Sequence, residues 1–480
     1  MQLPKHKTKI VCTIGPASRT DSVIKNLIKS GMNVARLNFS HGSPEEHRRD
    51  IHRIRSIASQ LKRDVTILID LPGPKIRIGT LQNEPLLLKK GDNVILTTDN
   101  IIGNVSRIPI NYKHLSQSVS KGSLIYLNDG FLQLKVRKVS GDEVICRVMI
   151  GGALLSHKGV NLPRAKISLD PITDKDLDFI DFGLKEGVDI FGTSFIEKAD
   201  DIHKVKEFAS KRGKSIYVVA KIERAEAARN IDEILDVADA IMIARGDLGV
   251  QISIEDVPVV QKNLIRKANL LGRPVITATQ MLESMTENIR PTRAEVTDVA
   301  NAILDGTDAV MLSEETAIGK YPVETIKMMA RIATSTERNR SAIKGPSHLE
   351  DSFRSGISKK NLSAEDVVSL NVIEAVRALN VRLIVTPTYT GSTPRRISRF
   401  KPDCWILSFS NYSPTYRFLA LSYGVFPFLI KKRVDDWHDV TMKLLKDYKL
   451  AKKGDRVILT EGKSLEKLSD ADSLRIITVS

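Results

Sequence analysis

Eight short apolar runs, each of strand length, constrain the fold of this chain more than any other feature. They span residues 8–14, 33–38, 65–70, 189–195, 216–220, 240–244, 274–279 and 308–313. Continuous apolar strands separated by amphipathic segments of helical length are typical of parallel βαβ units, whose sheet is covered on both faces. Eight such units in succession predict an α/β fold built on a (β/α)8 barrel.

The gap between the third and fourth runs is too long for one crossover and predicts an inserted domain. Pro72, Gly73 and Pro74 break the helix that should follow the third strand. Alternating apolar runs then begin at residues 93 and 131, with hairpin signals at Lys90-Gly-Asp and Ser140-Gly-Asp. We expect a small β-barrel that lies over the barrel mouth as a lid.

A polar segment, residues 341–363, precedes the last part of the chain. Five apolar strands follow, starting near residues 382, 405, 425, 456 and 474, and most are separated by helical spacing. This pattern predicts an open α/β sheet. The expected domains are therefore a barrel of residues 1–72 and 169–340, a lid of residues 73–168 and a C-terminal domain of residues 341–480.

Composition agrees with a cytoplasmic protein of several domains. The 480 residues suggest about three domains at the usual size, and 42% hydrophobic residues suffice for their cores. No apolar run approaches the roughly 20 residues of a membrane span, and we expect neither a signal peptide nor a membrane partner. The three cysteines are odd in number and far apart, which argues against a disulfide framework.

The net charge of +16 does not by itself predict nucleic-acid binding. Basic residues are spread along the chain, the longest basic run is Lys431-Lys432-Arg433, and aromatic residues make up only 5%. A dispersed excess of this kind is typical of a solvated surface that attracts anionic substrates. We therefore expect no specific nucleic-acid partner.

Charged residues follow two neighbouring strands of the predicted barrel. Lys221 and Glu223 end the fifth run and share one face of a strand, while Asp247 follows the sixth run. Because active sites of such barrels lie at the carboxyl ends of the strands, these residues should meet there. They predict a divalent metal on Glu223 and Asp247, with Lys221 facing an anion. Ion-paired strand ends without chemistry remain the alternative at this point.

Two further segments are suited to bind phosphate. Period two places Arg36, Asn38 and Ser40 on one face, a guanidinium group beside two neutral oxygen donors. In the C-terminal domain a strand ends in Thr388-Tyr-Thr-Gly-Ser-Thr393, hydroxyls and a glycine before a helix. An N-cap without a ligand is the alternative for the second segment.

An ordered set of motifs closely resembles the pyruvate kinase family. The set is Thr13-Ile-Gly-Pro-Ala-Ser18, Gly31-Met-Asn-Val-Ala-Arg-Leu-Asn-Phe-Ser-His41, Lys158-Gly-Val-Asn-Leu-Pro163, Lys221-Ile-Glu223, Ala244-Arg-Gly-Asp-Leu-Gly249, Ala278-Thr-Gln-Met-Leu-Glu-Ser284 and Arg290-Pro-Thr-Arg-Ala-Glu295. The resemblance covers barrel and insert and continues more weakly through the last domain.

The resemblance implies a glycolytic phosphotransferase that converts phosphoenolpyruvate and ADP to pyruvate and ATP. Magnesium, or manganese, would lie on Glu223 and Asp247. The implied catalytic residues are Arg36, Lys221 and Thr279. Substrate would also contact Ala244, Arg245, Gly246 and Asp247, and nucleotide would contact Thr13, Pro16, Asn38, His41, Arg77, Asp129 and Lys158.

The chain departs from potassium-dependent relatives after the third strand. Those relatives read Asp-Thr-Lys-Gly-Pro-Glu, whereas this chain reads Asp70-Leu-Pro-Gly-Pro-Lys75. The monovalent cation would lie near Asn38, Ser40 and Asp70, and the Lys75 ammonium would supply a positive charge in its place. We therefore expect potassium not to be required.

The resemblance also implies regulation and assembly. A phosphorylated effector would bind Thr388, Thr390, Gly391, Ser392 and Thr393, and the enzyme would be a homotetramer. Glu314 stands where glycine is commoner in the family, and nothing in the sequence explains it.

Two other classes of function compete with this interpretation. A magnesium-dependent aldolase or lyase that forms an enolate would explain Lys221, Glu223 and Asp247, but not the inserted lid. A catalytically inactive nucleotide sensor or nucleic-acid binder should have lost a metal ligand or the lysine, and none is lost.

Overall fold

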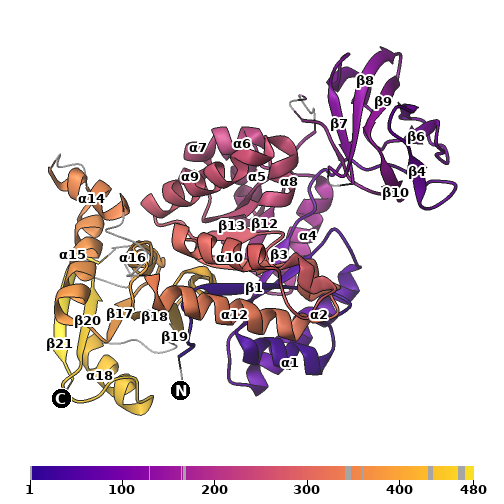
Figure 1. The fold of residues 1–480 in the computed structure, drawn as a ribbon. Coiled ribbons are helices and arrows are strands. Elements are labelled where there is room, and N and C mark those ends of the chain that lie inside the picture. Colours follow the sequence, from indigo (N-terminus) through magenta and orange to yellow (C-terminus); the bar gives the residue numbers. More distant parts are fainter. Residues whose placement is uncertain are drawn as a thin grey trace.

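The computed structural model describes residues 3–128, 130–163, 165, 169–340, 348–358, 362–430, 436–462 and 471–479. It shows three parts in a row, with the barrel between the β-rich insert and the C-terminal sheet (Figure 1). None of the helices in the described part of the chain has the length and apolar character that a bilayer crossing requires.

The central part is a closed barrel of eight parallel strands, as predicted. Its strands lie in the order β1-β16-β15-β14-β13-β12-β3-β2. Their bounds are β1 Lys9–Ile14, β2 Val34–Asn38, β3 Thr66–Asp70, β12 Ile190–Thr193, β13 Tyr217–Ile222, β14 Ala240–Ala244, β15 Val275–Ala278 and β16 Ala309–Leu312. Each predicted apolar run therefore overlaps one barrel strand, and β13 extends two residues beyond its run.

Helices join these strands and cover the outside of the barrel. They are α1 Asp21–Ser30, α2 Pro44–Gln60, α4 Asp174–Lys185, α5 Ala199–Ser210, α6 Ala225–Arg229, α7 Ile231–Val237, α8 Arg245–Gln251, α9 Val257–Leu270, α10 Arg293–Asp305, α11 Glu314–Ala317 and α12 Pro322–Arg338. Local sequence fixes several starts: Ser43 and Glu46 form a capping box on α2, and Thr292 and Glu295 form one on α10. Such caps satisfy backbone N–H groups that a helix start leaves without partners.

The barrel interior is apolar in its middle and is closed at the bottom by the C-terminal domain. Inward-facing strand residues form one buried cluster, including Val11, Leu68 and Met242. Phe418 and Leu421, from the C-terminal domain, belong to the same cluster and are fully buried. The lumen is therefore a packed core, and ligands can approach only its opposite, carboxyl end.

The insert is a small β domain between β3 and α4. Its elements are β4 Leu86–Leu88, β5 Asn93–Thr97, β6 Arg107–Pro109, α3 Leu115–Ser118, β7 Leu124–Leu127, β8 Leu132–Ser140, β9 Glu143–Ile150, β10 Gly152–Leu154 and β11 Val160–Asn161. Six strands form one sheet in the order β11-β7-β8-β9-β5-β6. Bridges from Arg77 to Gly159 and from Ile78 to Ile110 link the two edges through one crossing segment, which makes the domain barrel-like.

One of the two hairpin signals in the insert was wrong. The turn at Ser140-Gly-Asp joins β8 and β9, which pair antiparallel as expected. The turn at Lys90-Gly-Asp joins β4 and β5, but β4 pairs with β10 and β5 pairs with β9 and β6. A local turn pattern predicts a turn but does not determine which strands pair. Here pairing between strands distant in sequence decides the partners of β4 and β5.

The C-terminal part contains a five-stranded sheet in the order β19-β18-β17-β20-β21, in which only β21 is antiparallel. Its elements are α14 His348–Ser358, α15 Ala364–Leu379, β17 Leu383–Pro387, α16 Ser392–Ser398, β18 Trp405–Ser410, α17 Ser413–Phe418, β19 Val425–Leu429, α18 Trp437–Asp447, β20 Arg456–Glu461 and β21 Ser473–Thr478. All five predicted strands are present. The residue limits expected for the three domains stay predictions.

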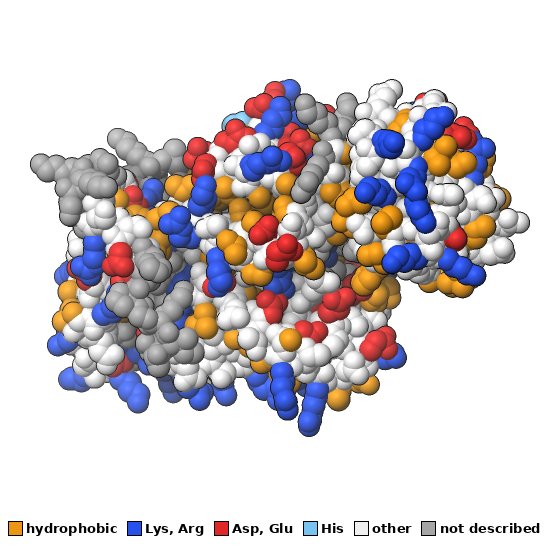
Figure 2. All heavy atoms as spheres, turned by 45° about the horizontal axis from the view of Figure 1, so that its top comes forward, with side chains coloured by type: hydrophobic (Ala, Val, Ile, Leu, Met, Phe, Trp, Pro, Cys, Tyr) orange, Lys and Arg blue, Asp and Glu red, His pale blue; other side chains and the backbone are white. Residues whose placement is uncertain are grey.

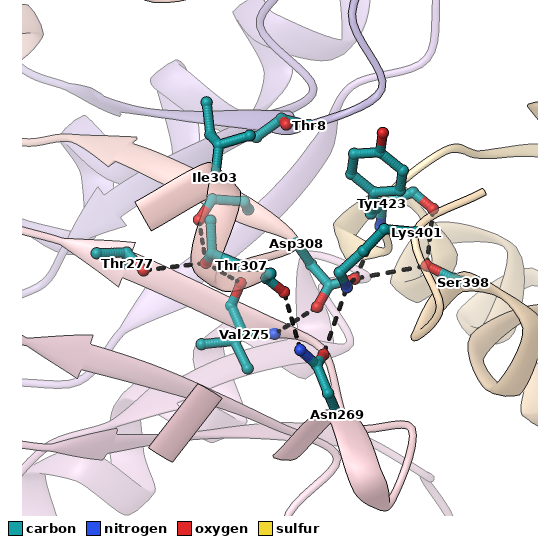
Figure 3. A network of polar contacts seen from close by, with 12 residues as sticks. Thr8, Asn269, Val275, Thr277, Ile303, Thr307, Asp308, Ser398, Lys401 and Tyr423 are labelled. Atoms are coloured by element: carbon teal, nitrogen blue, oxygen red, sulfur yellow. Dashed lines mark hydrogen bonds and ion pairs between the residues drawn. The ribbon is translucent and has the colours of Figure 1, made fainter. Parts of the chain in front are cut away.

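A buried ion pair joins this sheet domain to the bottom of the barrel (Figure 3). Lys401 Nζ lies 2.8 Å from Asp308 Oδ1, and both side chains are 4% exposed. Asp308 Oδ1 also accepts a hydrogen bond from the Tyr423 N–H at 2.9 Å, and Oδ2 accepts one from the Val275 N–H at 3.1 Å. One carboxylate at the start of β16 thus ties the two domains together.

The basic residues do not gather into one patch on the face that Figure 2 presents. Lys and Arg side chains there lie over the insert, the barrel and the C-terminal part, with Asp and Glu between them. This distribution fits the dispersed charge expected from the sequence.

Candidate active site

Lys221 is the centre of the charged groups at the carboxyl ends of the barrel strands. Its Nζ lies 2.8 Å from Glu223 Oε1 and 3.2 Å from Asp70 Oδ1. The ammonium donates a hydrogen bond to Ser194 Oγ at 2.7 Å. Burial would lower the pKa of Lys221, but Asp70 and Glu223 outweigh it and raise that pKa above its ordinary value. Lys221 is therefore a permanent buried cation.

Asp70 joins this lysine to the arginine predicted to bind phosphate. Arg36 Nη2 lies 2.5 Å from Asp70 Oδ2, and Arg36 Nη1 donates to Thr13 Oγ1 at 2.9 Å. Burial favours the neutral form of Asp70, but Lys221 and Arg36 together lower its pKa. A Cβ on Gly192 would lie 3.1 Å from Asp70 Oδ1, so the glycine leaves room for this carboxylate. Arg36 therefore lies beside Asp70 and Lys221, and its role as a phosphate ligand stays a prediction.

Glu223 and Asp247 form a pair of carboxylates that suits a divalent cation. Glu223 is 2% exposed and accepts a hydrogen bond from the Phe195 N–H at Oε2, 2.9 Å away. Burial raises the pKa of Glu223, Asp247 raises it further, and Lys221 opposes the rise. Neither a hydrogen bond nor an ion pair holds the half-buried Asp247 carboxylate among the described residues. A cation between the two would relieve their repulsion.

The two carboxylates suit a magnesium ion whose coordination is completed by water and substrate, rather than a metal held by protein ligands alone. The described residues contain no group of three or more His, Cys, Asp or Glu side chains placed to hold a metal. Magnesium is commonly held by one or two carboxylates, with water and substrate oxygens filling its other positions. Two carboxylates at the carboxyl ends of the barrel strands meet that requirement.

The turn after β14 meets the end of β15. The Gly246 N–H donates to Thr279 Oγ1 at 2.9 Å, and Arg245 Nη2 donates to the Thr279 carbonyl at 2.7 Å. Thr279 has φ +65°, which is rare for a β-branched residue and is typical of strain retained at functional sites. Ala244 is buried and ends β14, and Arg245 pairs with Asp298. The Gly246 N–H is thus already engaged, and the guanidinium of Arg245 is held by Asp298 and the Thr279 carbonyl.

Four basic side chains lie together where the insert meets the barrel. The positive charges of Arg77, Lys75 and Arg36 add to burial in lowering the pKa of His41. Arg77 Nη1 donates to the His157 carbonyl at 2.8 Å, next to Lys158. The structure therefore places Arg77 and His41 near one another and near the backbone next to Lys158; their role as nucleotide contacts stays a prediction.

The other predicted nucleotide residues lie around the same edge. Thr13 is buried and Pro16 is exposed in the turn after β1, while Asn38 ends β2. Asp129 lies outside the described residues. Glu314 is exposed, and its charge acts on His41; nothing else in the structure explains its presence.

The residues of the expected monovalent-cation site are only partly free. Asn38 Oδ1 accepts a hydrogen bond from the Ser40 N–H at 3.1 Å. Asp70 is occupied by Arg36 and Lys221. The Lys75 side chain makes no ion pair among the described residues, and it lies on the same side as His41.

The predicted effector segment forms a compact loop before α16. Gly391 has φ +78°, which explains the glycine there. The Thr388 Oγ1 accepts from the Gly391 N–H at 2.9 Å, and the Thr390 Oγ1 accepts from the Ser392 N–H at 3.2 Å. Thr393 Oγ1 accepts from the Ala471 N–H at 3.3 Å. A phosphate bound here would have to exchange with these internal hydrogen bonds.

Sequence reasoning missed Ser194 and Phe195, which contact Lys221 and Glu223. Ser194 lies near the end of the predicted run 189–195, directly after β12, so the expectation that site residues lie at the carboxyl ends of strands could have included it. Phe195 contributes its backbone N–H at φ +57°, and no sequence pattern signals that conformation.

Barrel, insert and strand-end charges define the class: a (β/α)8 barrel protein whose buried cations and carboxylates gather where barrel enzymes bind substrate. Two family models match the chain, "Pyruvate kinase, barrel domain" over residues 5–326 and "Pyruvate kinase, alpha/beta domain" over residues 366–477. The chain belongs to the pyruvate kinase family.

Individual relatives agree with this assignment over full length. The chain is 50% identical over 479 residues to the pyruvate kinase of Thermococcus litoralis, covering 100% of both chains. It is 42% identical over 483 residues to that of Geobacillus stearothermophilus, covering 99% of this chain and 81% of the relative. A solved pyruvate kinase from Cryptosporidium parvum superposes with a TM-score of 0.90 at 35% identity, covering 99% of this chain and 97% of the other.

Proposed function

We propose that this chain transfers the phosphoryl group of phosphoenolpyruvate to ADP, giving pyruvate and ATP. Family membership supports the reaction and does not favour an aldolase or a lyase. The observation that carries the proposal is Lys221, a buried cation held between Asp70 and Glu223. Phosphoryl transfer needs positioning and charge neutralisation more than covalent chemistry from the protein.

Glu223 and Asp247 would hold Mg²⁺, and Mn²⁺ is the other ion that their oxygen atoms suit. The pyruvate kinase family is generally magnesium-dependent. When bound, the ion would neutralise charge on the substrate oxygens. The repulsion between the buried Glu223 and the half-buried Asp247 supports this assignment.

The remaining roles fall to residues around the same edge. Lys221 would steady the phosphoryl group in transfer and the enolate left behind, and Arg36 would bind the phosphate. Thr279 would lie near the carbon that the enolate protonates, with water as the proton donor. The turn from Ala244 to Asp247, including Arg245 and Gly246, would bind the substrate carboxylate through backbone N–H groups. Because the Gly246 N–H is engaged by Thr279, substrate would have to compete for it or use its neighbour.

Nucleotide would bind between insert and barrel. His41, Arg77 and Lys158 supply positive or polar groups there, and Thr13, Pro16 and Asn38 border the same edge. Closure of the insert would complete the site and exclude water.

Potassium would not be required. The supporting observation is the cluster of Lys75, Arg77 and Arg36, whose positive charges act together on His41, close in sequence to Asn38 and Ser40. A further cation there would be repelled.

We also propose that the chain resembles its family in regulation, in assembly and in cellular compartment. A phosphorylated sugar or nucleotide would bind the loop Thr388–Thr393, and four copies would form a homotetramer in the cytoplasm. The hydroxyl groups of the loop support the effector site.

A coupled assay for pyruvate tests the proposal. Phosphoenolpyruvate and ADP should give pyruvate only when magnesium or manganese is present. Zero turnover with magnesium would overturn it. Turnover of another enolate-forming substrate without ADP would favour a lyase instead.

A further inference from the structure

The turn that follows β12 contacts two proposed functional residues at the end of the neighbouring strand β13, Lys221 and Glu223. We infer that Ser194 is a positioning residue that holds the Lys221 ammonium in place and ties it to the root of the inserted domain. This inference rests on the proposed function, because it assigns how Lys221 is kept in position for phosphoryl transfer.

The hydrogen bonds of Ser194 have a single direction. Lys221 can only donate, so Ser194 Oγ accepts from Nζ at 2.7 Å and its own proton is donated to the Leu71 carbonyl at 2.7 Å. Ser194 is 3% exposed, and little water competes for these bonds. The orientation of the hydroxyl is therefore fixed from both sides.

Ser194 is needed to position Lys221 because the other groups that contact its ammonium also bind other cations. Three oxygens lie close to Nζ, from Ser194, Asp70 and Glu223. Glu223 is a proposed metal ligand, and Asp70 is shared with Arg36. Ser194 is the neutral neighbour whose remaining bond goes to the backbone. Without it, Lys221 would depend on two carboxylates that also serve other cations.

The same turn reaches the hinge of the insert. Phe195 has φ +57°, an uncommon conformation for an aromatic residue, and it directs its N–H to Glu223 Oε2. A Cβ on Gly73 would lie 2.7 Å from Phe195 Cδ2 and 3.2 Å from Ser194 Cβ. The start of the insert therefore packs directly on the two residues that contact Lys221 and Glu223.

The test is Ser194→Ala, measured in the full chain. We expect kcat to fall about 10- to 100-fold, because a small misplacement of a catalytic group is costly. The KM for phosphoenolpyruvate should change less than about threefold, and Mn²⁺ binding, measured by paramagnetic resonance without turnover, should be unchanged. Ser422→Ala is the matched control, since its Oγ is equally buried and has no hydrogen-bond partner among the described residues.

A double variant separates positioning from general destabilisation. In a Lys221→Met background, adding Ser194→Ala should change kcat less than about twofold, because Ser194 acts through the missing ammonium. An unchanged kcat in the single variant, a further full loss in the double variant, or weaker Mn²⁺ binding would each overturn the inference. A wild-type enzyme without turnover would instead refute the proposed function, so the two failures are distinguishable.

Discussion

At the scale of single residues, the charged groups of the site follow from strand geometry, and their supporting contacts do not. Lys221 and Glu223 were predicted to share one face because they are two residues apart in a strand, and their side chains lie within 2.8 Å. Arg36 was predicted to bind phosphate, and its ion pair with Asp70, at 2.5 Å, was not foreseen. That contact joins two strands and depends on barrel register, which a single strand pattern does not contain.

The lysine itself gives the first prediction. Lys221→Met should retain binding of Mn²⁺ and phosphoenolpyruvate but lose about 10²–10³-fold in kcat, because the ammonium interacts chiefly with charge that develops during transfer. Steady-state kinetics and direct Mn²⁺ binding measure the two parts separately. Weaker substrate binding with kcat preserved would assign Lys221 to the ground state.

Lys75 gives the second prediction. With tetramethylammonium as the only monovalent cation, the wild type should be fully active, because Lys75 and its neighbours already supply positive charge. Lys75→Glu should become dependent on potassium. Lys89→Glu, an exposed residue in the same insert, controls for the change in net charge.

Strong potassium activation of the wild type would contradict the Lys75 prediction. So would a Lys75→Glu variant that remains active without potassium.

At the scale of elements, apolar runs predicted strands well and strand partners less well. The barrel strands and β17, β18 and β20 were found because each is a largely buried apolar run, whereas the partly buried β19 and the mostly exposed β21 were found from their apolar residues alone. Inside the insert, the pairing of β4 with β10 was missed because these strands are far apart in sequence. Local turn chemistry cannot report such a contact.

The loop before α16 gives the third prediction. Adenosine monophosphate, ribose 5-phosphate or glucose 6-phosphate should raise the apparent affinity for phosphoenolpyruvate. Thr390→Ala with Ser392→Ala should abolish that response, because it removes hydroxyls that would bind phosphate. Basal activity measured without effector serves as the control. A response to any of these activators that the double variant leaves unchanged would place the effector site elsewhere.

At the scale of the whole molecule, the junction between barrel and C-terminal domain contains several buried charges. Lys9 is 4% exposed; its Nζ donates to the Val425 carbonyl at 2.6 Å and lies 5.1 Å from the centre of the Trp405 ring. Burial lowers the pKa of Lys9 to about 7, although Glu337 and Asp308 oppose the shift. Sequence gave no sign of this, because Lys9 lies in an otherwise ordinary first strand.

The lowered pKa of Lys9 gives the fourth prediction, on stability. Between a folded pKa of about 7 and an unfolded value of 10.5, the unfolded chain binds the extra proton. The contribution of Lys9 to the free energy of unfolding should therefore rise with pH in that window, by at most about 1.4 kcal/mol per pH unit. Urea unfolding at pH 7 and pH 9.5 measures it.

Lys9→Met should remove this dependence, so that its stability relative to the wild type is greater at pH 7 than at pH 9.5. Lys5→Met, at an exposed position, should leave the pH dependence of the wild type intact. A constant difference between wild type and Lys9→Met across the window would contradict the assignment.

The closure of the barrel floor by Phe418 and Leu421 has a consequence for how such a chain can evolve. Because these two side chains complete a core that the barrel strands begin, the barrel cannot exchange its C-terminal domain as an independent module. A replacement domain must bring side chains of matching volume to the barrel floor, or it leaves a cavity in the barrel core. The barrel and the C-terminal domain are therefore expected to change together at their contact, while the outer loops of the C-terminal sheet can vary independently of it.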